Sequence, residues 1–340
     1  MHHSLKMIPT RRPRILMIFT GGTISMRFDP TVGGPVPAMT GEQILSQVRG
    51  IQDVIDVGVE DFARLPGPHM TPARMWELAG AARAGIRDPE IDAVVITHGT
   101  DTLEESAYLL DLVLDTAKPV VFVGAMRNSS ELSWDGPANL LAATRVAADP
   151  GARGLGVMIV MANQVFAAAD ATKTDPGALD TFQGRDTGPL GTVDQDRVIW
   201  WHRPFARDQV PAQRLEERVE IIKLSAGSDG RLVRLAIEDG ARGLVVECLG
   251  RGNVPITALE QVLWAVRSEI PIVLTSRCPR GRVLDTYAYE GAGRELRVAG
   301  AILGGSLPSH KARIKLMLLL GADSSVQQIR KAFESEIVPS

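Results

Sequence analysis

The sequence predicts an α/β protein with two domains. The larger, amino-terminal domain is expected to have a mostly parallel, doubly wound sheet of the flavodoxin-like or Rossmann-like kind. Short apolar segments that suit buried strands alternate with segments whose apolar residues recur every three or four positions. This alternation is typical of a parallel sheet covered by helices. A chain of 340 residues is also longer than one ordinary domain, so a smaller α/β domain is expected at its carboxyl end.

Strand-like segments follow one another along the chain. In order they are Arg14–Phe19, Ala93–Thr97, Val120–Val123, Val157–Met161, Val219–Lys223, Gly243–Glu247, Ile272–Thr275 and Ala299–Leu303. Helical spacing between them is clearest in Met75, Leu78, Ala79 and Ala82, and in Leu103, Ala107, Leu110 and Leu114. No fixed-period repeat or low-complexity segment interrupts this order.

A charged and proline-rich stretch divides the two predicted domains. Residues 204–217 combine two prolines with five charged residues, a composition typical of a linker. The amino-terminal domain is therefore predicted to span residues 14–203 and the carboxy-terminal domain residues 218–340. Two further connections are long. Met26–Pro37, rich in glycine and proline, is predicted to be a mobile lid, and Gly177–Gly191 a surface excursion.

Composition and charge exclude several classes of protein. Hydrophobic residues make up 45% of the chain and charged residues 23%, as in ordinary soluble domains. A net charge of −3 indicates neither a nucleic-acid nor a membrane partner, so a small-molecule partner is expected. The amino-terminal residues have no apolar stretch of signal-peptide length, and Ile314–Leu320 is too short to span a bilayer. A cytoplasmic protein is predicted.

Neither a metal nor a cofactor is expected. The two cysteines, Cys248 and Cys278, are predicted to be buried free thiols. His98 lies near a carboxylate but has no second histidine at matching spacing, so a structural role is favoured. The glycine-rich turn Thr20–Thr23 lacks the spacing of a dinucleotide fingerprint, and no Walker lysine follows it.

Two threonines stand where strand-like runs end at glycine. Thr23 lies in the run Ile18–Ser25, and Thr100 lies in the run Val95–Leu103. Ligands of open α/β sheets bind at the carboxyl ends of the strands, where both hydroxyls are expected. Asp101 follows Thr100 directly. This combination suggests chemistry with a threonine nucleophile, which needs a base or a nearby cation to assist it.

Lys173, with a threonine on either side, is a candidate for that assistance. If it folds back toward Thr100 and Asp101, their titrations are coupled and the cluster can move protons to or from a water or hydroxyl. Two plainer interpretations stay open. Lys173 can be a solvated loop residue, and Asp101 or Thr102 can simply cap the helix that follows.

Together these segments resemble the bacterial-type L-asparaginase family. Ile18–Ser25 and Ala93–Leu103 match its two signatures, around Thr-Gly-Gly-Thr-Ile and His-Gly-Thr-Asp-Thr. Five shorter matches follow in a consistent order: Val123–Arg127, Asp135–Leu140, Thr172–Thr174, Gly250–Asn253 and Gly304–Arg313. The resemblance runs from about Arg14 to about Phe333. Residues 281–288 are similar to the cytoplasmic, type I-like subgroup.

The resemblance implies roles for individual residues. Thr23 would be the nucleophile that attacks the side-chain amide carbon. Thr100, Asp101 and Lys173 would form a second catalytic cluster, in which Asp101 also binds the substrate's α-amino group. The backbone N–H of Thr100 would stabilise the oxyanion. The substrate-binding residues implied in this way are Gly22, Gly67, Pro68, Gly99, Thr100, Asp101, Ala125 (through its carbonyl) and Asn253.

The resemblance also implies an assembly. Members of this family form intimate dimers that are often paired into tetramers, so a homodimer or homotetramer is expected. Asn253 resembles the residue that family members supply to a neighbouring subunit's site.

Two positions depart from the family's pattern. A lid tyrosine usually polarises the nucleophilic threonine, but Met26–Pro37 contains none, and Pro30 or Pro35 falls where it would align. Either another group of the loop or a water activates Thr23, or the enzyme is slow. A serine that binds the α-carboxylate is common where Gly67 falls. The choice between asparagine and glutamine is therefore open.

The predicted reaction is hydrolysis of L-asparagine to L-aspartate and ammonia through an acyl-enzyme on Thr23, which makes the protein an L-asparaginase, an amidohydrolase. One alternative is a non-catalytic sensor that binds an amino acid in the same pocket. Another is the asparaginase-like subunit of the amidotransferase that acts on glutamyl-tRNA. That subunit carries an extra amino-terminal β-domain, for which no room is expected before Thr20.

Overall fold

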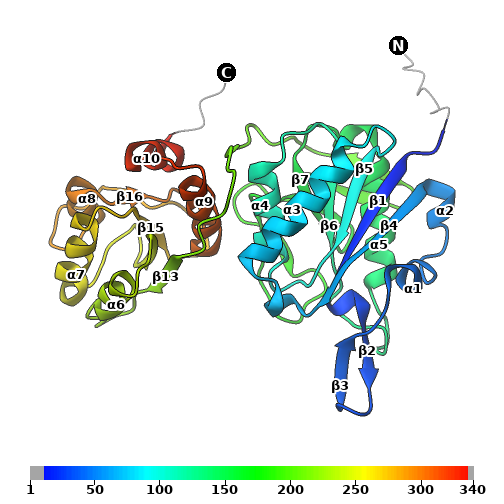
Figure 1. Ribbon diagram of the computed structural model, residues 1–340, viewed down its shortest axis with the longest axis horizontal. Coiled ribbons are helices and arrows are strands. Elements are labelled where there is room, and N and C mark those ends of the chain that lie inside the picture. Colours follow the sequence, from blue (N-terminus) through cyan, green and yellow to red (C-terminus); the bar gives the residue numbers. More distant parts are fainter. Residues whose placement is uncertain (1–10, 336–340) are drawn as a thin grey trace.

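Residues 11–335 are described by a computed structural model of the chain. They form two α/β units, one around an eight-stranded sheet and one around a four-stranded sheet (Figure 1). The predicted fold class, α/β with a larger amino-terminal and a smaller carboxy-terminal domain, is confirmed.

The large sheet is parallel in its centre and on one side. Its strand order is β12-β11-β8-β7-β6-β5-β1-β4. Strands β4, β1, β5, β6 and β7 run parallel, whereas β8, β11 and β12 add an antiparallel edge. The bounds are β1 Arg14–Gly21, β4 Asp56–Leu65, β5 Ala93–Thr97, β6 Val120–Val123, β7 Val157–Met161, β8 Gln164–Ala167, β11 Gly191–Asp194 and β12 Arg197–Trp200.

Helices cover both faces of this sheet. Helices α3 and α4 pack on one face, and α1, α2 and α5 pack on the other. The bounds are α1 Gly41–Leu45, α2 Ile51–Val54, α3 Pro72–Arg87, α4 Leu103–Val113 and α5 Gly136–Ala148. Since both faces are buried, the central strands read as continuous apolar runs, and Ala93–Thr97 is buried at every residue.

The connection after Thr23, which the sequence predicted to be a loop, has regular secondary structure. It is an antiparallel hairpin, β2 Met26–Asp29 and β3 Gly34–Pro37, which projects from the large domain (Figure 1). The backbone N–H of Phe28 donates to the Ser130 hydroxyl, and Ser129 donates to the Met26 carbonyl. Pro30 lies in the turn, and Pro35 and Pro37 lie in β3, an edge strand, which proline tolerates.

The segment Gly177–Gly191 was also expected to lie on the surface, but part of it is core. It contains β10 Phe182–Gly184, which pairs with β9 Ala171–Lys173. Phe182 and Leu190 are each only 1% exposed. Their apolar side chains hold this segment against the large domain.

The carboxy-terminal unit has a parallel sheet in the order β13-β14-β15-β16. Helices α6, α7 and α8 cover one face, and α9 and α10 cover the other. The bounds are β13 Val219–Lys223, α6 Arg231–Glu238, β14 Gly243–Cys248, α7 Ile256–Arg267, β15 Ile272–Ser276, α8 Gly293–Ala299, β16 Ile302–Leu303, α9 Ser309–Gly321 and α10 Val326–Glu334. The predicted strand Ala299–Leu303 begins too early, because Ala299 still ends α8.

Helix α9 joins the two units. It packs on β13, β14 and β15 and also contacts α4 of the large domain. Its apolar run, which the sequence showed as Ile314–Leu320, is buried almost throughout, as expected of a helix with neighbours on every side. Helix α9 therefore lies where the carboxy-terminal unit meets α4.

Two smaller sequence predictions have different outcomes. Cys248 is buried, as predicted, but Cys278 is exposed. In the stretch from residue 11 to residue 335, no helix is long and apolar enough to cross a bilayer.

Candidate active site

Thr23 and Thr100 follow neighbouring strands of the large sheet. Strands β1 and β5 pair in register from Ile15 with Ala93 to Phe19 with Thr97, where β5 ends, and β1 ends two residues later at Gly21. The chain order reverses between these two strands, since β4 lies on one side of β1 and β5 on the other. Such a switch point at the carboxyl ends of the strands is where open α/β sheets bind ligands.

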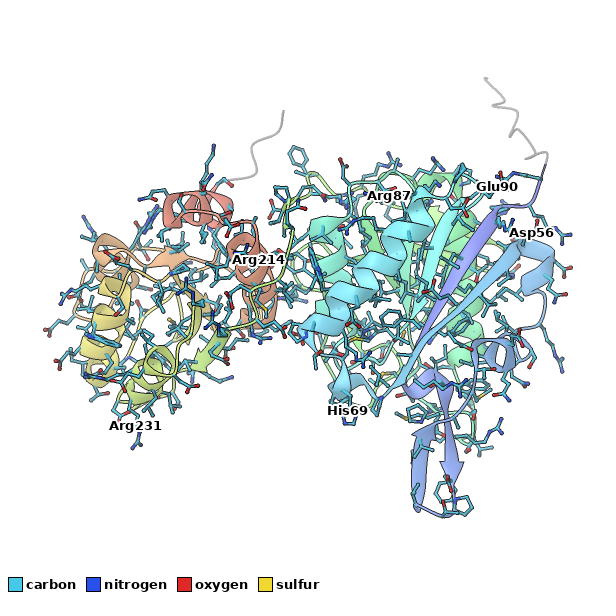
Figure 2. All side chains as sticks on the ribbon, viewed as in Figure 1. Asp56, His69, Arg87, Glu90, Arg214 and Arg231 are labelled. Atoms are coloured by element: carbon cyan, nitrogen blue, oxygen red, sulfur yellow. The ribbon has the colours of Figure 1, made fainter. Side chains whose placement is uncertain are left out.

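The two ends of the sheet are easy to tell apart in Figure 2. His69, which closes the turn after β4, lies at the lower end of the large domain, on the side of the hairpin. Asp56, Arg87 and Glu90 lie at the opposite end, where the parallel strands begin. Thr23 and Thr100 belong to the His69 end.

Glycines bring the two threonine segments into contact. A Cβ on Gly22 would lie 2.4 Å from the Cα of Gly99, and a Cβ on Gly99 would lie 2.5 Å from the Cα of Gly67. Gly22 also has φ of +77°, which favours glycine. Three turns therefore meet through bare backbone. Thr23 follows Gly22 directly, and Thr100 follows Gly99 directly.

Lys173 does fold back onto the second threonine. Its Nζ donates to Thr100 Oγ1 at 3.0 Å and to Asp101 Oδ1 at 2.7 Å. The Lys173 side chain is 15% exposed and that of Asp101 56% exposed, so the ion pair opens to solvent on the carboxylate side. Asp101 Oδ2 accepts no hydrogen bond from residues 11–335, so this oxygen of a half-exposed side chain is available to a ligand. The structure thus brings together three of the four residues predicted to be catalytic.

The turn after β4 closes another side of the site. Gly67 begins a short 3₁₀ turn, Gly67–His69, and a Cβ on it would lie 3.4 Å from the Cβ of Asp101. The Thr102 hydroxyl donates to the Gly67 carbonyl at 2.8 Å and so ties this turn to the segment carrying Asp101. A residue with a Cβ is disfavoured in a helical conformation before proline, which explains glycine ahead of Pro68.

Ala125 follows β6 and is fully buried. Its turn is held by Asp135, whose carboxylate accepts from the backbone N–H groups of Met126 and Arg127 at 3.0 and 2.9 Å. Asn139 donates to the Gly124 carbonyl at 3.1 Å. The motif Asp135–Leu140 therefore shapes the backbone around Ala125.

His98 is a structural residue, as favoured from the sequence. It is fully buried, and its Nδ1 donates to the Gly99 carbonyl while Nε2 accepts from the Ser106 hydroxyl, both at 2.8 Å. Burial lowers the pKa of His98 to about 4, so the ring is neutral at pH 7. Over residues 11–335 no group of three or more metal-binding side chains is found.

Asn253 lies in the carboxy-terminal domain, away from this cluster. Its Oδ1 accepts from the backbone N–H of Gly293, and its backbone pairs with Leu249. No hydrogen bond joins it to the other predicted site residues in the part of the chain that is described.

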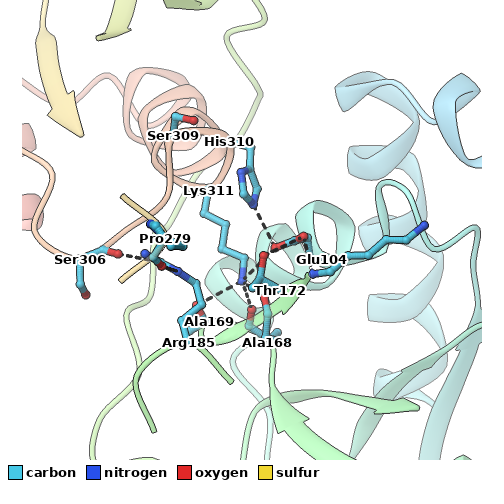
Figure 3. Close-up of polar contacts among 12 residues, drawn as sticks. Glu104, Ala168, Ala169, Thr172, Arg185, Pro279, Ser306, Ser309, His310 and Lys311 are labelled. Carbon is cyan, nitrogen blue, oxygen red and sulfur yellow. Dashed lines mark hydrogen bonds and ion pairs between the residues drawn. The ribbon is translucent and has the colours of Figure 1, made fainter. Parts of the chain in front are cut away.

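Glu104 was not among the residues predicted for the site. Helix α4 has Thr102 at its N-cap and no side-chain capping bond. Instead, Glu104 is buried beside Lys173: its Oε1 accepts from the Lys173 backbone N–H at 3.0 Å and from the Thr172 hydroxyl at 3.1 Å (Figure 3). The sequence offered one signal for it: Glu104 stands next to Leu103, an apolar residue on the buried side of α4.

The second oxygen of Glu104 faces the carboxy-terminal domain. His310 Nε2 lies 3.0 Å from Oε2 and Lys311 Nζ lies 3.7 Å from it, both from the start of α9 (Figure 3). Burial alone would raise the pKa of Glu104, but the His310 hydrogen bond and the Lys311 charge outweigh it and lower the pKa to about 2. Burial in turn lowers the pKa of Lys311 to about 8.

The depressed pKa of Glu104 predicts a loss of stability in acid. An ordinary glutamate titrates near 4.5, so the carboxylate's contribution is present above pH 4.5 and lost as the pH falls toward 2. A shift of this size corresponds to roughly 3 kcal/mol of unfolding free energy. Denaturant unfolding of the wild type and Glu104→Gln at several pH values between 6 and 2 measures it, and the two curves are expected to converge in acid.

Glu105→Gln is the matched control for this measurement. Burial raises the pKa of Glu105, so its protonated form is favoured by folding and its contribution changes in the opposite direction with pH. Wild-type and Glu104→Gln curves that stay parallel down to pH 2 would contradict the assignment.

A cavity of about 630 Å³ lies between the two domains but is separate from this site. Its lining includes Tyr108, Asp111, Arg185, Arg297 and Phe333. Thr23, Thr100 and Lys173 do not line it.

Two family models match the chain. The amino-terminal asparaginase domain matches residues 14–206, and the glutaminase/asparaginase carboxy-terminal domain matches residues 218–333. Together these matches cover most of the chain.

Individual relatives agree with the family models. A probable L-asparaginase of Deinococcus radiodurans is 40% identical over 96% of this chain and 98% of its own length. An L-asparaginase of Bacillus licheniformis is 33% identical over 91% of this chain and 96% of its own. The crystal structure of a probable cytoplasmic L-asparaginase from Campylobacter jejuni superimposes with a TM-score of 0.87 at 29% identity, covering 96% of this chain and 100% of that one. The chain therefore belongs to the asparaginase family.

Proposed function

We propose that this protein hydrolyses L-asparagine to L-aspartate and ammonia, with Thr23 as nucleophile. The observation that carries the proposal is the Lys173–Thr100–Asp101 cluster, set beside Thr23 by the contact between Gly22 and Gly99. Family membership supports an amide substrate, and the named relatives support asparagine.

In the first step the Thr23 hydroxyl oxygen attacks the side-chain amide carbon. The negative charge that develops on the amide oxygen is stabilised by the backbone N–H of Thr100. The carbon–nitrogen bond then breaks, and ammonia leaves with the proton from Thr23. A β-aspartyl ester on Thr23 remains. The Ala125 carbonyl accepts a hydrogen bond from the leaving amide and so orients it.

In the second step water attacks this ester. Lys173 passes one proton to Asp101 Oδ1 and then, as the neutral amine, takes the proton of the water through Thr100 Oγ1. A proton is delivered to the Thr23 oxygen as its bond to the acyl carbon breaks, which releases aspartate and restores the hydroxyl. The Oδ2 atom of Asp101, which is not bonded to Lys173, binds the α-amino group of the substrate. Gly67 and Pro68 offer only backbone groups to the α-carboxylate, and no tyrosine of the hairpin assists Thr23.

We also propose where the protein works and how it assembles. The protein works in the cytoplasm as a homodimer or homotetramer, and Asn253 serves the site of a neighbouring subunit. Its domains span residues 14–203 and 218–340, with a linker between them.

Ammonia release from asparagine, glutamine and glutamyl-tRNA tests this function. Turnover of asparagine is expected, with neither tRNA dependence nor a metal requirement. Tight binding of asparagine without ammonia release would instead make the protein an amino-acid sensor. Release that requires glutamyl-tRNA would make it an amidotransferase subunit.

The missing hydroxyl at position 67 predicts a gain in substrate binding on substitution. Gly67→Ser, made in the Pro68→Ala background so that the pre-proline restriction is removed, places a hydroxyl beside Asp101. One hydrogen bond to a charged carboxylate contributes about 1.5 kcal/mol or more, so the KM for asparagine is expected to fall about tenfold or more. Steady-state kinetics measure this, with Gly67→Ala in the same background as control. Equal KM values in the two variants would contradict it.

A further inference from the structure

Glu104 occupies an unusual position between the two domains. It is buried at the start of α4, and each of its oxygens faces a different part of the chain (Figure 3). Oε1 accepts from Thr172 and Lys173 of β9, whereas Oε2 lies against His310 and Lys311 of α9. A buried carboxylate with donors on both oxygens is held in one orientation.

The contact with β9 bears directly on Lys173. Strand β9 has three residues and pairs only with the equally short β10 in the part of the chain that is described, so its ladder bonds hold it weakly. Glu104 adds a charge-assisted bond to the backbone of Lys173 itself. Because Glu104 follows Asp101 by one helical turn, the backbone of Lys173 is tied to the segment that its side chain must reach.

Lys311 supports the same strand from the other domain. Its fully buried Nζ donates to the carbonyls of Ala168, Ala169 and Ala171, the residues that lead into Lys173. Glu104 lies 3.7 Å from this ammonium and offsets the cost of burying its charge. The start of α9 therefore contacts β9 in two ways: directly through Lys311, and indirectly through His310, which lies against Glu104.

We propose that Glu104 is a positioning residue that, together with His310 and Lys311 of the carboxy-terminal domain, holds Lys173 Nζ against Thr100 and Asp101. In this arrangement the carboxy-terminal domain acts on the site of its own chain. This inference rests on the proposed role of Lys173 in catalysis and extends it to residues that do not touch the substrate.

Glu104→Gln tests the inference in the full-length protein. Glutamine keeps the shape but has one acceptor oxygen and no charge, so with that oxygen on β9 it turns an NH2 group toward the Lys311 ammonium and loses the ion pair that holds α9. Since a misplacement of about 1 Å can cost on the order of 10²-fold in rate, kcat for asparagine is expected to fall about 10- to 100-fold with little change in KM. Glu105→Gln removes a neighbouring carboxyl that makes no hydrogen bond within residues 11–335, and it is expected to retain the wild-type kcat.

A double-mutant cycle separates positioning from a general loss of structure. If Glu104 acts through Lys173, adding Glu104→Gln to Lys173→Met is expected to change kcat less than twofold. Equal effects of Glu104→Gln in both backgrounds, or no effect in the wild type, would overturn the inference. Lys173→Met with wild-type kcat would instead refute the proposed function.

The reactivity of the Lys173 side chain can be measured even in variants whose turnover is too slow to compare. Reductive methylation of lysines, read by mass spectrometry of the peptide that contains Lys173, reports how firmly this ammonium is held. Several-fold faster modification of Lys173 is expected in Glu104→Gln and not in Glu105→Gln. Equal modification rates in the two variants would overturn the inference independently of activity.

Discussion

Replacement of Thr23 by valine is expected to abolish ammonia release from asparagine, with kcat at least about 10³-fold below the wild type. Valine matches the shape of threonine but has no hydroxyl, so no ester with the substrate can form. Losses of this size or larger follow when a catalytic nucleophile is removed. Binding of asparagine is expected to persist, because Asp101 and the backbone of Thr100 are untouched.

Three measurements check this expectation. Steady-state assays of ammonia give kcat, calorimetry gives the affinity for asparagine, and acid quenching followed by peptide mapping locates the β-aspartyl ester. Thr23→Ser, which keeps a hydroxyl, should retain measurable turnover and form the ester at the same position. An ester found on Thr100, or full activity in Thr23→Val, would assign the nucleophile elsewhere.

Lys173→Met is expected to lower kcat by about 10²- to 10⁴-fold, the range over which a positioned acid or base contributes. Methionine has a similar length and fits the half-buried site, but it cannot donate to Thr100 Oγ1 or Asp101 Oδ1. The loss should be larger in kcat than in KM, because the lysine contacts Thr100 and lies behind Asp101, to which the proposed mechanism gives the α-amino group of the substrate. Pre-steady-state kinetics should show slower hydrolysis of the ester.

Lys118→Met provides a matched control for this variant. Lys118 donates to the carbonyls of Ile86 and Asp88 near the end of the large sheet where the parallel strands begin. Its removal costs comparable hydrogen bonds and one positive charge but leaves the site alone, so kcat should stay within about twofold. If both variants lose activity equally, the effect of Lys173→Met comes from charge or stability and not from chemistry.

Much of the fold could be predicted because buried parallel strands have a distinct sequence pattern. Ala93–Thr97, Val120–Val123 and Val157–Met161 are apolar apart from Thr97 and match β5, β6 and β7 residue for residue. Strand β4 was missed because Asp56–Leu65 lies at the sheet edge and carries polar residues. The hairpin after Thr23 was missed because its prolines and glycines are also the residues of loops.

The candidate site could be predicted where its residues are close in sequence to a strand end. Thr23 and Thr100 follow β1 and β5 directly, so the motifs alone located them at the sheet edge. The approach of Lys173 to Thr100 was only a hypothesis, since 73 positions separate them in the chain. The exposure of Cys278 and the burial of Phe182 and Leu190 could not be predicted because they depend on distant packing.

The sequence by itself determined the class of fold, the family resemblance and the residues that stand at the ends of the strands, because these follow from local periodicity and short motifs. Only the tertiary structure decided how those residues are held. The pairing of Glu104 with His310 joins residues 206 positions apart, and the contact of Gly22 with Gly99 depends on two strands lying side by side. Such contacts arise when helices and strands pack together. The apolar pattern that drives packing does not specify which buried polar groups will meet.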